Sequence, residues 1–417
     1  MEKEPHPLTS PVAPLILITV SGKDHPGITS AMTAVLAHHQ AVILDVGQSV
    51  IRGLLSLSIL FQPGGQEKST QTKLTDDLIK KAEDLGLQLQ TKHMDPVDLK
   101  QAQKAHLTSS AHRYALTLLG SPISAQAVHE VTETLAKDRL NIDQIQRLSD
   151  GEFSCVEFLL STSESVNSKA LKERLLKTAQ SLGVDISFQA EGLFRRAKRL
   201  IVLDMDSTLI QNEVIDEFAR QKGVYEQVAA ITEKAMQGEL DFNESLKKRC
   251  ALLQGINEKD IESVYQNIKL TPGAEELCYV LKRLGYKIAI ISGGFLKVAD
   301  RLKTKLGLDF AYANRMIFKD GVFTGSIQAP YLNAQRKADL LDVISQQENI
   351  ELDQVIAIGD GANDLLMLKK AGLGIAFNAK PVVSAQADFS LNQKNLRNIF
   401  YLLGLSGRDV KEILASS

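Results

Sequence analysis

The sequence is poor in cysteine and has no long apolar segment, and both shortages limit what the protein can be. Only three cysteines occur in 417 residues, at Cys155, Cys250 and Cys278. They are odd in number and far apart, which argues against a disulfide framework and a zinc site and fits a reducing cytoplasmic location. Because no run approaches the roughly 18 apolar residues needed to cross a bilayer, we expect no membrane-spanning segment.

A strong charge of either sign is also missing. The 48 Lys and Arg residues nearly balance 50 Asp and Glu, for a formal net charge of −2. This balance gives no electrostatic reason to expect nucleic acid or an anionic membrane as a partner. The first residues contain Glu2, Glu4 and several prolines but no apolar core. We therefore expect an N-terminal arm over residues 1–13 and not a signal peptide.

The first half of the chain contains two segments with the same predicted order of elements. Residues 14–93 show the order β-α-β-β-α-β, and residues 111–191 repeat it. This is the ferredoxin-like arrangement. The polar residues 94–110 between the segments are predicted to be a linker with some helix. The predicted strands are 15–20, 41–51, 54–61, 87–91, 112–119, 140–148, 153–161 and 184–190, and the predicted helices are 28–39, 74–85, 125–137 and 168–182.

The second half alternates short apolar strands with helices. This alternation predicts an α/β core with a mostly parallel sheet and helices on both faces, a Rossmann-like arrangement. We place this core at residues 198–211 and 271–403, and the polar, helix-rich residues 212–270 between them are predicted to form a helical cap. The strands are predicted at 200–203, 287–291, 354–358 and 374–376, and the helices at 273–284, 299–306, 336–346 and 364–370.

Two aspartates follow the first strand of this core. Like charges as close as those of Asp204 and Asp206 raise each other's free energy, which a proton or a divalent cation relieves. Mg²⁺ prefers such hard oxygen ligands, and we expect it to bind the carboxylates of Asp204 and Asp360 and the carbonyl of Asp206. An ionised carboxylate can attack phosphorus, so Asp204 is the predicted nucleophile. Asp206 is left as the general acid and base.

Further polar groups follow the other predicted strands. Ser292-Gly293-Gly294 follows the second strand, and Gly359-Asp360-Gly361-Ala362-Asn363-Asp364 follows the third. Because strand ends of a parallel sheet meet at one edge, these groups should converge. Ser292 and the amides after it can bind phosphate oxygens, Lys337 can offset developing negative charge, and Asn363 is a predicted substrate ligand. Each motif alone also fits a turn, a helix cap or a solvated lysine; their conjunction favours phosphoryl chemistry.

The four motifs resemble those of the haloacid dehalogenase superfamily, and residues 198–403 resemble its phosphoserine phosphatases. The resemblance implies hydrolysis of O-phospho-L-serine through an aspartyl phosphate, with Mg²⁺, as the last step of L-serine biosynthesis. It also implies that Glu213 pairs with the substrate ammonium and Arg249 with its carboxylate, while Met236 and Phe242 exclude water. Without the motifs, Glu213 would be interpreted as a helix cap and Arg249 as a surface charge. Met236 and Phe242 would be interpreted as core residues.

The two N-terminal segments resemble ACT domains, which sense amino acids in metabolic enzymes. The loop with Asp24, Gly27 and Ile28 is similar to the ACT ligand loop, which implies L-serine or another amino acid as a ligand; an ordinary helix start is an equal reading. The second segment has Gly120-Ser121-Pro122-Ile123 at that place, without the Asp and Gly of the pattern. Paired ACT domains commonly join edge to edge, so the resemblance implies a homodimer.

Three other functions fit part of the sequence. A phosphotransferase or phosphatase on the same fold would act on another small amino-acid phosphate, the former passing the phosphoryl group to a second alcohol. A non-enzymatic amino-acid sensor would carry a degenerate catalytic part, but none of the four motifs is missing. A receiver-type signalling domain also phosphorylates an aspartate, yet it needs neither the acid at Asp206 nor the cap at 212–270.

Overall fold

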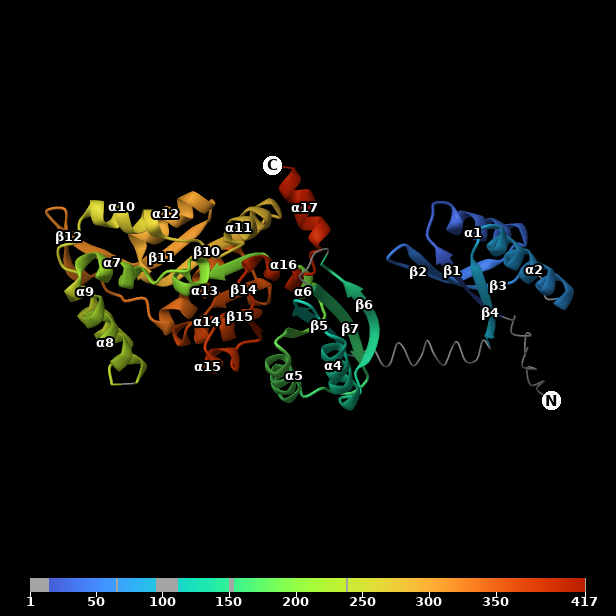
Figure 1. Cartoon of the computed structure of the whole chain (residues 1–417), viewed down its shortest axis with the longest axis horizontal. Coiled ribbons are helices and arrows are strands. Elements are labelled where there is room, and N and C mark those ends of the chain that lie inside the picture. Colours follow the sequence, from blue (N-terminus) through green and yellow to red (C-terminus); the bar gives the residue numbers. More distant parts are fainter. Residues whose placement is uncertain (1–14, 65–66, 95–111, 150–153, 238, 417) are drawn as a thin grey trace, which may run out of the picture. The chain divides into compact units, whose positions relative to one another are not determined.

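A computed structural model describes residues 15–64, 67–94, 112–149, 154–237 and 239–416 of the chain (Figure 1). The predicted N-terminal arm, nearly all of the predicted linker and residues 150–153, where the Asp150-Gly151 pair predicts a turn, lie outside these residues. The chain divides into two compact units, Met1–Ser109 and Ser110–Ser417. Among the described residues, no helix combines the length and the apolar character needed to span a bilayer.

The first unit is an antiparallel sheet in the order β2-β3-β1-β4, with two helices on one face. Alternate residues of β1, including Ile16 and Ile18, are buried under these helices because successive side chains of a strand point to opposite faces. The helix predicted from residue 74 begins earlier, at Lys68, in a stretch without apolar periodicity. The elements are β1 (Leu15–Lys23), α1 (Ile28–His38), β2 (Val42–Ile51), β3 (Leu54–Gln62), α2 (Lys68–Asp84) and β4 (Gln88–Met94).

The second unit begins with a sheet of the same topology, in the order β6-β7-β5-β8. Its two helices pack side by side against one face (Figure 1). The β-α-β-β-α-β order predicted for both N-terminal segments is therefore confirmed. The elements are β5 (His112–Gly120), α4 (Ala125–Lys137), β6 (Asn141–Arg147), β7 (Ser154–Thr162), α5 (Ser168–Leu182) and β8 (Asp185–Ala190).

The rest of the second unit is built on six parallel strands in the order β11-β10-β9-β14-β15-β16. The predicted α/β core is thus confirmed. β9, β14 and β15 are buried along their whole length, as expected for strands covered on both faces. The strands are β9 (Leu200–Leu203), β10 (Lys287–Phe295), β11 (Phe310–Asn314), β14 (Val355–Gly359), β15 (Leu373–Phe377) and β16 (Phe389–Leu391).

Helices cover both faces of this sheet. Leu200 and Val202 of β9 belong to the core with α13 (Ala334–Glu348) and α14 (Leu365–Lys370). Ile201 and Leu203 belong to the core on the other face, formed with the helices α11 (Ala274–Arg283) and α12 (Leu296–Leu306). Every side chain of β9 is therefore used for packing, which fixes the strand end that Asp204 follows.

The predicted insertion after the first strand is a group of four helices. It comprises α7 (Val214–Lys222), α8 (Tyr225–Met236), α9 (Phe242–Leu252) and α10 (Glu258–Asn267). The chain leaves and re-enters the core side by side, because Ile210 and Leu270 form a β-bridge. An unpredicted hairpin of β12 (Met316–Lys319) and β13 (Val322–Ile327) packs on α9.

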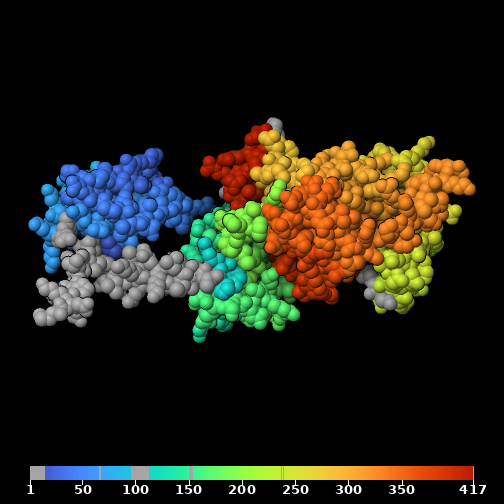
Figure 2. Space-filling model, turned by 180° about the vertical axis from the view of Figure 1, so that it is seen from behind, coloured from blue at the N-terminus to red at the C-terminus, as the bar shows by residue number. Residues whose placement is uncertain are grey.

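The second ferredoxin-like domain is attached to the six-stranded core, as the contact of green with orange and red in Figure 2 shows. Arg195 in α6 (Leu193–Arg196) is buried and ion-paired with Glu157 and with Glu191, the latter at 2.7 Å. Asp185 of β8 accepts hydrogen bonds from the side chain and backbone of Asn392, at 2.8 and 3.1 Å. Asp185 therefore bonds the catalytic part directly, whereas Arg195 holds the connecting helix α6 to the domain.

Candidate active site

The end of β9 positions the first pair of acids. The backbone N–H of Asp204 donates to the Ile358 carbonyl of the neighbouring strand at 2.8 Å. A short turn, Met205–Leu209, follows at once, and within it Ser207 has a φ of 55°. Asp206, between Asp204 and Ser207, keeps an extended backbone with φ −66° and ψ 135°.

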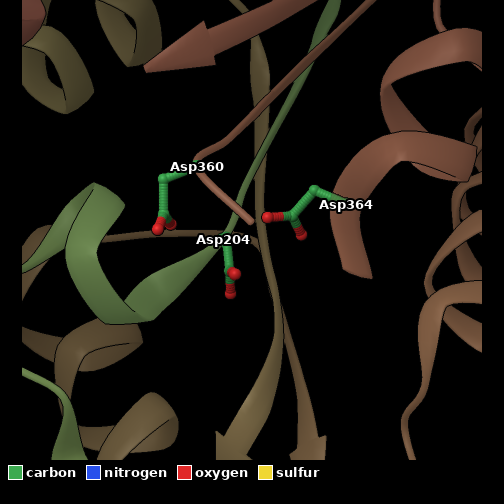
Figure 3. Close-up of side chains that lie close together, drawn as sticks. All are labelled: Asp204, Asp360 and Asp364. Atoms are coloured by element: carbon green, nitrogen blue, oxygen red, sulfur yellow. The ribbon is translucent and has the colours of Figure 1, made fainter. Parts of the chain in front are cut away.

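Three carboxylates from two strand ends converge at one place. Ligand oxygens of Asp204, Asp360 and Asp364 lie within 4.8 Å of one another (Figure 3). Asp204 follows β9, and the other two follow β14. The hydroxyl of the buried Thr208 donates to Asp360 Oδ1 at 3.0 Å. The predicted convergence of the first and third strand ends is therefore observed.

A buried lysine lies behind this cluster. Lys337, in the first turn of α13, has no exposed surface. Its ammonium lies 2.8 Å from Asp204 Oδ2 and donates to Asp364 Oδ1 at 2.7 Å. Burial alone would disfavour the charge, but Asp204 and Asp364 outweigh it and raise the lysine pKa above its ordinary value. Lys337 thus stays charged and holds Asp204 in place.

The single positive charge of Lys337 does not neutralise the three carboxylates of the cluster. Burial, followed by the charges of Asp204, Asp364 and Glu213, raises the pKa of Asp360 to about 7. Burial and Asp204 also raise the pKa of Asp364 to about 7, against the opposing effect of Lys337. Clustered carboxylates with raised pKa values are relieved by a divalent cation, and oxygen ligands of this kind suit a hard one.

Asp206 is held away from the cluster by two hydrogen bonds. Its Oδ1 accepts from the backbone N–H of Val214 at 2.8 Å, and its Oδ2 accepts from the Ser292 hydroxyl at 3.1 Å. Burial, then the charges of Glu213 and Asp204, raise the pKa of Asp206 well above its ordinary value. A carboxyl of this kind retains a proton that it can donate to a leaving group.

The C-terminal end of β10 needs a glycine at position 294. A Cβ atom on Gly294 would stand 2.5 Å from Asp206 Oδ2 and 2.8 Å from Met205 Cε. This end of the strand is fixed by the buried Asn314, whose side-chain amide donates to the Gly293 carbonyl at 2.7 Å. The Gly294 N–H donates to the Ser292 hydroxyl oxygen at 2.9 Å. The chain therefore brings Ser292 directly to the predicted acid.

These groups surround a cavity of about 200 Å³ between the strand ends and the cap. Most of the predicted site residues line it, together with Ile215 and Leu246, which were not predicted. Lys337 is buried beneath the cavity, and Met236 ends α8 with a side chain outside what the structure describes. The predicted residues in the lining are Asp204, Asp206, Glu213, Phe242, Arg249, Ser292, Gly293, Asp360 and Asn363.

Two charged residues of opposite sign come from the cap. Glu213 immediately precedes α7, and its Oε1 accepts a hydrogen bond from the Ser207 hydroxyl at 2.6 Å. Burial raises the Glu213 pKa, against the effects of Ser207 and Arg249. Arg249 lies near the end of α9, and its buried Nε has no hydrogen-bond partner among the described residues. Beside the cluster of Asp204, Asp360 and Asp364, the cavity therefore offers an acid and a guanidinium whose Nε is unsatisfied among the described residues.

Two polar residues of the site were also missed from the sequence. Asp364 belongs to the motif that follows the third predicted strand but received no role there, although it pairs with Lys337 and completes the acidic cluster. Thr208 bonds Asp360, which follows a distant strand. The role of Asp364 could have been inferred from its spacing of four residues after Asp360. Nothing in the sequence pattern indicates the partner of Thr208.

The predicted ACT ligand loop lies between β1 and α1 in the first unit. The N–H of Asp24 donates to the Gly53 carbonyl at 2.9 Å. Gly27 adopts a φ of 98° before the helix, where other residues are strained, and Ile28 is buried in the core of the unit. Of these residues, Asp24 and Gly27 are exposed, whereas Ile28 is only 2% exposed.

Comparisons with protein families divide the chain in the same way. A model of haloacid dehalogenase-like hydrolases matches residues 198–372. Two ACT-domain models match residues 14–92 and 110–189. The fold and the acidic site thus define a haloacid dehalogenase-like hydrolase preceded by two ACT domains.

Individual relatives narrow this class. A phosphoserine phosphatase of Streptomyces coelicolor is 40% identical over 400 residues, covering 95% of this chain and 94% of the relative. One of Mycobacterium tuberculosis is 39% identical over 396 residues, with the same coverage of 95% and 94%. A solved haloacid dehalogenase-family hydrolase of Salmonella enterica has a TM-score of 0.61 at 30% identity, covering 69% of this chain and 98% of its own. The chain belongs to the phosphoserine phosphatase family.

Proposed function

We propose that the protein hydrolyses O-phospho-L-serine to L-serine and phosphate, the last step of L-serine biosynthesis. The observation that carries the proposal is that one cavity combines groups suited to a phosphate ester with charged groups suited to an amino acid. Asp204, Asp206 and Ser292 face a phosphate ester, and Glu213 and Arg249 offer opposite charges to an amino acid. A cavity of about 200 Å³ suits a substrate as small as phosphoserine. The family relatives support the same substrate.

The acidic cluster fits Mg²⁺. Asp204 and Asp360 offer carboxylate oxygens close together, and the Asp206 carbonyl is the third proposed protein ligand. When bound, the ion supplies positive charge that reduces the repulsion between a carboxylate nucleophile and a phosphate ester. Asp364 is already paired with Lys337, so we assign it to holding that lysine.

The chain's own groups then carry out two displacements. In the first, an Asp204 carboxylate oxygen bonds to phosphorus while the bond from phosphorus to the serine oxygen breaks. Asp206 gives its proton to that oxygen, and Lys337 and Ser292 stabilise the phosphoryl charge. In the second, Asp206 accepts a proton from water, whose oxygen bonds to phosphorus and displaces the Asp204 carboxylate. The raised pKa of Asp206 supports its role as the acid.

Phosphate release with Mg²⁺ from a panel of small phosphate esters tests the assignment. We expect phosphoserine to be the preferred substrate and Asp204→Asn to abolish turnover without unfolding the protein. Asp76→Asn, on the exposed face of α2, is the charge-matched control and should retain activity. Turnover by Asp204→Asn would contradict the mechanism. Transfer of phosphate to an added alcohol in place of water would favour the phosphotransferase alternative.

We also propose a cytoplasmic homodimer in which L-serine or another amino acid binds the ACT domains, with Asp24, Gly27 and Ile28 as the ligand loop. The dimer is supported by β2, an edge strand whose residues are all exposed, including Val42, Val46 and Ile51. The unpaired edge of such an apolar strand favours pairing with another strand. We place the domain limits at 14–93, 111–191 and 198–403, with the cap at 212–270.

A further inference from the structure

The turn between the two catalytic strand-end acids and the cap contains one residue in an unusual conformation. Ser207 has φ 55° and ψ 3°, a left-handed backbone that residues other than glycine, asparagine and aspartate rarely adopt. Backbone hydrogen bonds hold this turn. Ser207 N–H donates to the Asn212 carbonyl at 3.3 Å, and Ile210 N–H donates to the Met205 carbonyl at 3.0 Å. The turn is therefore fixed without the serine hydroxyl.

The hydroxyl has a different partner. It donates to Glu213 Oε1 at 2.6 Å, across the point where the chain enters the cap. The next bond along this junction joins Asp206 Oδ1 to the N–H of Val214 at 2.8 Å. Two consecutive residues of the turn thus hold two consecutive residues at the start of α7.

We propose that Ser207 is a positioning residue for recognition of the substrate ammonium. By occupying Oε1 of Glu213, its hydroxyl fixes the carboxylate at the cavity wall and leaves Oε2 for the ammonium. This inference rests on the proposed function, because it assigns the Glu213 carboxylate to the amino group of phosphoserine. Ser207 acts through Glu213, and its effect should therefore fall on substrates that carry the amino group.

The physical basis is preorganisation. A free glutamate side chain samples several rotamers, and binding must then fix one of them. The Ser207 hydrogen bond fixes the side chain before the substrate arrives. Losing one ordinary hydrogen bond of this kind changes affinity about fivefold.

The test compares phosphoserine with its deamino analogue, 3-(phosphonooxy)propanoate, in the full-length protein with Mg²⁺. Ser207→Gly removes the hydroxyl and keeps a residue suited to positive φ. We expect the kcat/KM preference for phosphoserine over the analogue to fall about fivefold, mainly through KM. Gln211→Ala is the matched control, because Gln211 bonds the Leu270 carbonyl at the same junction without touching Glu213.

A double variant separates positioning from general damage. In the Glu213→Gln background, Ser207→Gly should change the preference little, because its partner is already altered. An unchanged preference in Ser207→Gly, an equal loss for both substrates, or full additivity with Glu213→Gln would overturn the inference. A wild-type protein that hydrolyses phosphoserine and its deamino analogue equally well would instead refute the role of Glu213, which belongs to the proposed function.

Discussion

The ammonium of Lys337 lies 2.8 Å from Oδ2 of Asp204, in a place without solvent exposure. The lysine is thus a fixed partner of the proposed nucleophile and not a mobile surface charge. Its second partner, Asp364, comes from the loop after β14, so one side chain joins three segments that are distant in the sequence. This arrangement makes the lysine the first target for mutation.

Lys337→Met should lower kcat by about 10²–10³-fold, the range seen when a charge stabilising a transition state is removed. It should also destabilise the protein by about 3–5 kcal/mol, because Asp204 and Asp364 are left buried and unpaired. Phosphate release and urea unfolding would measure the two effects. Lys369→Met is the control, since Lys369 is exposed and bonds only Gln386 among the described residues. Wild-type kcat in Lys337→Met would refute the role.

The acidic cluster predicts a pH dependence of stability in the metal-free protein. Asp360 and Asp364 have pKa values of about 7 when folded, far above the usual 3.8. The folded state therefore binds more protons than the unfolded state between about pH 4 and 7, so their contribution to stability falls as pH rises through that window and is constant above it. Thermal unfolding of the wild type and Asp360→Asn, compared from pH 4.5 to 8, should show a smaller decline in the variant.

Mg²⁺ should reverse this trend. The ion requires ionised ligands, so its stabilising effect should grow as pH rises towards 8, where fewer protons must be displaced. The change in melting temperature on adding Mg²⁺ at pH 5.5 and at pH 8 measures this. An equal shift at both pH values, or an undiminished shift in Asp360→Asn, would show that the ion binds elsewhere.

Arg249 should set the requirement for a substrate carboxylate. Arg249→Ala is expected to reduce the kcat/KM preference for phosphoserine over phosphoethanolamine by about 10–100-fold, the value of a charged hydrogen bond. Arg249→Lys should restore only part of the preference, because an ammonium lacks the planar fork. Steady-state kinetics on both substrates would check this. Lys248→Ala, on the exposed side of α9, is the control, and an unaltered preference in Arg249→Ala would contradict the assignment.

The β2 edge predicts the oligomeric state. Val46→Lys should convert the proposed dimer to a monomer, because a charge on an edge strand opposes pairing. Light scattering after size-exclusion chromatography would show the mass. Ile145→Lys is the matched control, since Ile145 is a comparably exposed residue on β6, the corresponding edge strand of the second domain. A monomeric wild type, or a Val46→Lys dimer, would refute this interface.

The sequence predicted the repeated domains and the parallel core because their apolar patterns are local and strong. Strands such as Leu200–Leu203 consist wholly of buried residues, and the motifs follow them directly. β11, β16 and the β12–β13 hairpin were missed because they are short and have little periodicity. The convergence of Asp204, Lys337 and Ser292 could be inferred from sheet topology.

Other features depend on contacts between distant segments. The pairing of Thr208 with Asp360 and the closeness of Gly294 to Asp206 arise from how the strand ends are stacked. The hydroxyl of Ser207 reaches Glu213 from a residue whose own backbone is left-handed. Such contacts depend on backbone geometry that no residue pattern specifies.

The attachment of the second ACT domain determines where the chain can be truncated. Leu119, Leu148 and Cys155 of that domain are buried in the same apolar cluster as the catalytic core. A fragment beginning near Lys198 would lose these three residues and the hydrogen bonds of Asn392 to Asp185, and it would expose apolar surface prone to aggregation. For expression and crystallisation, the smallest sound fragment of this protein therefore begins before β5, at about residue 110, and carries one ACT domain with it.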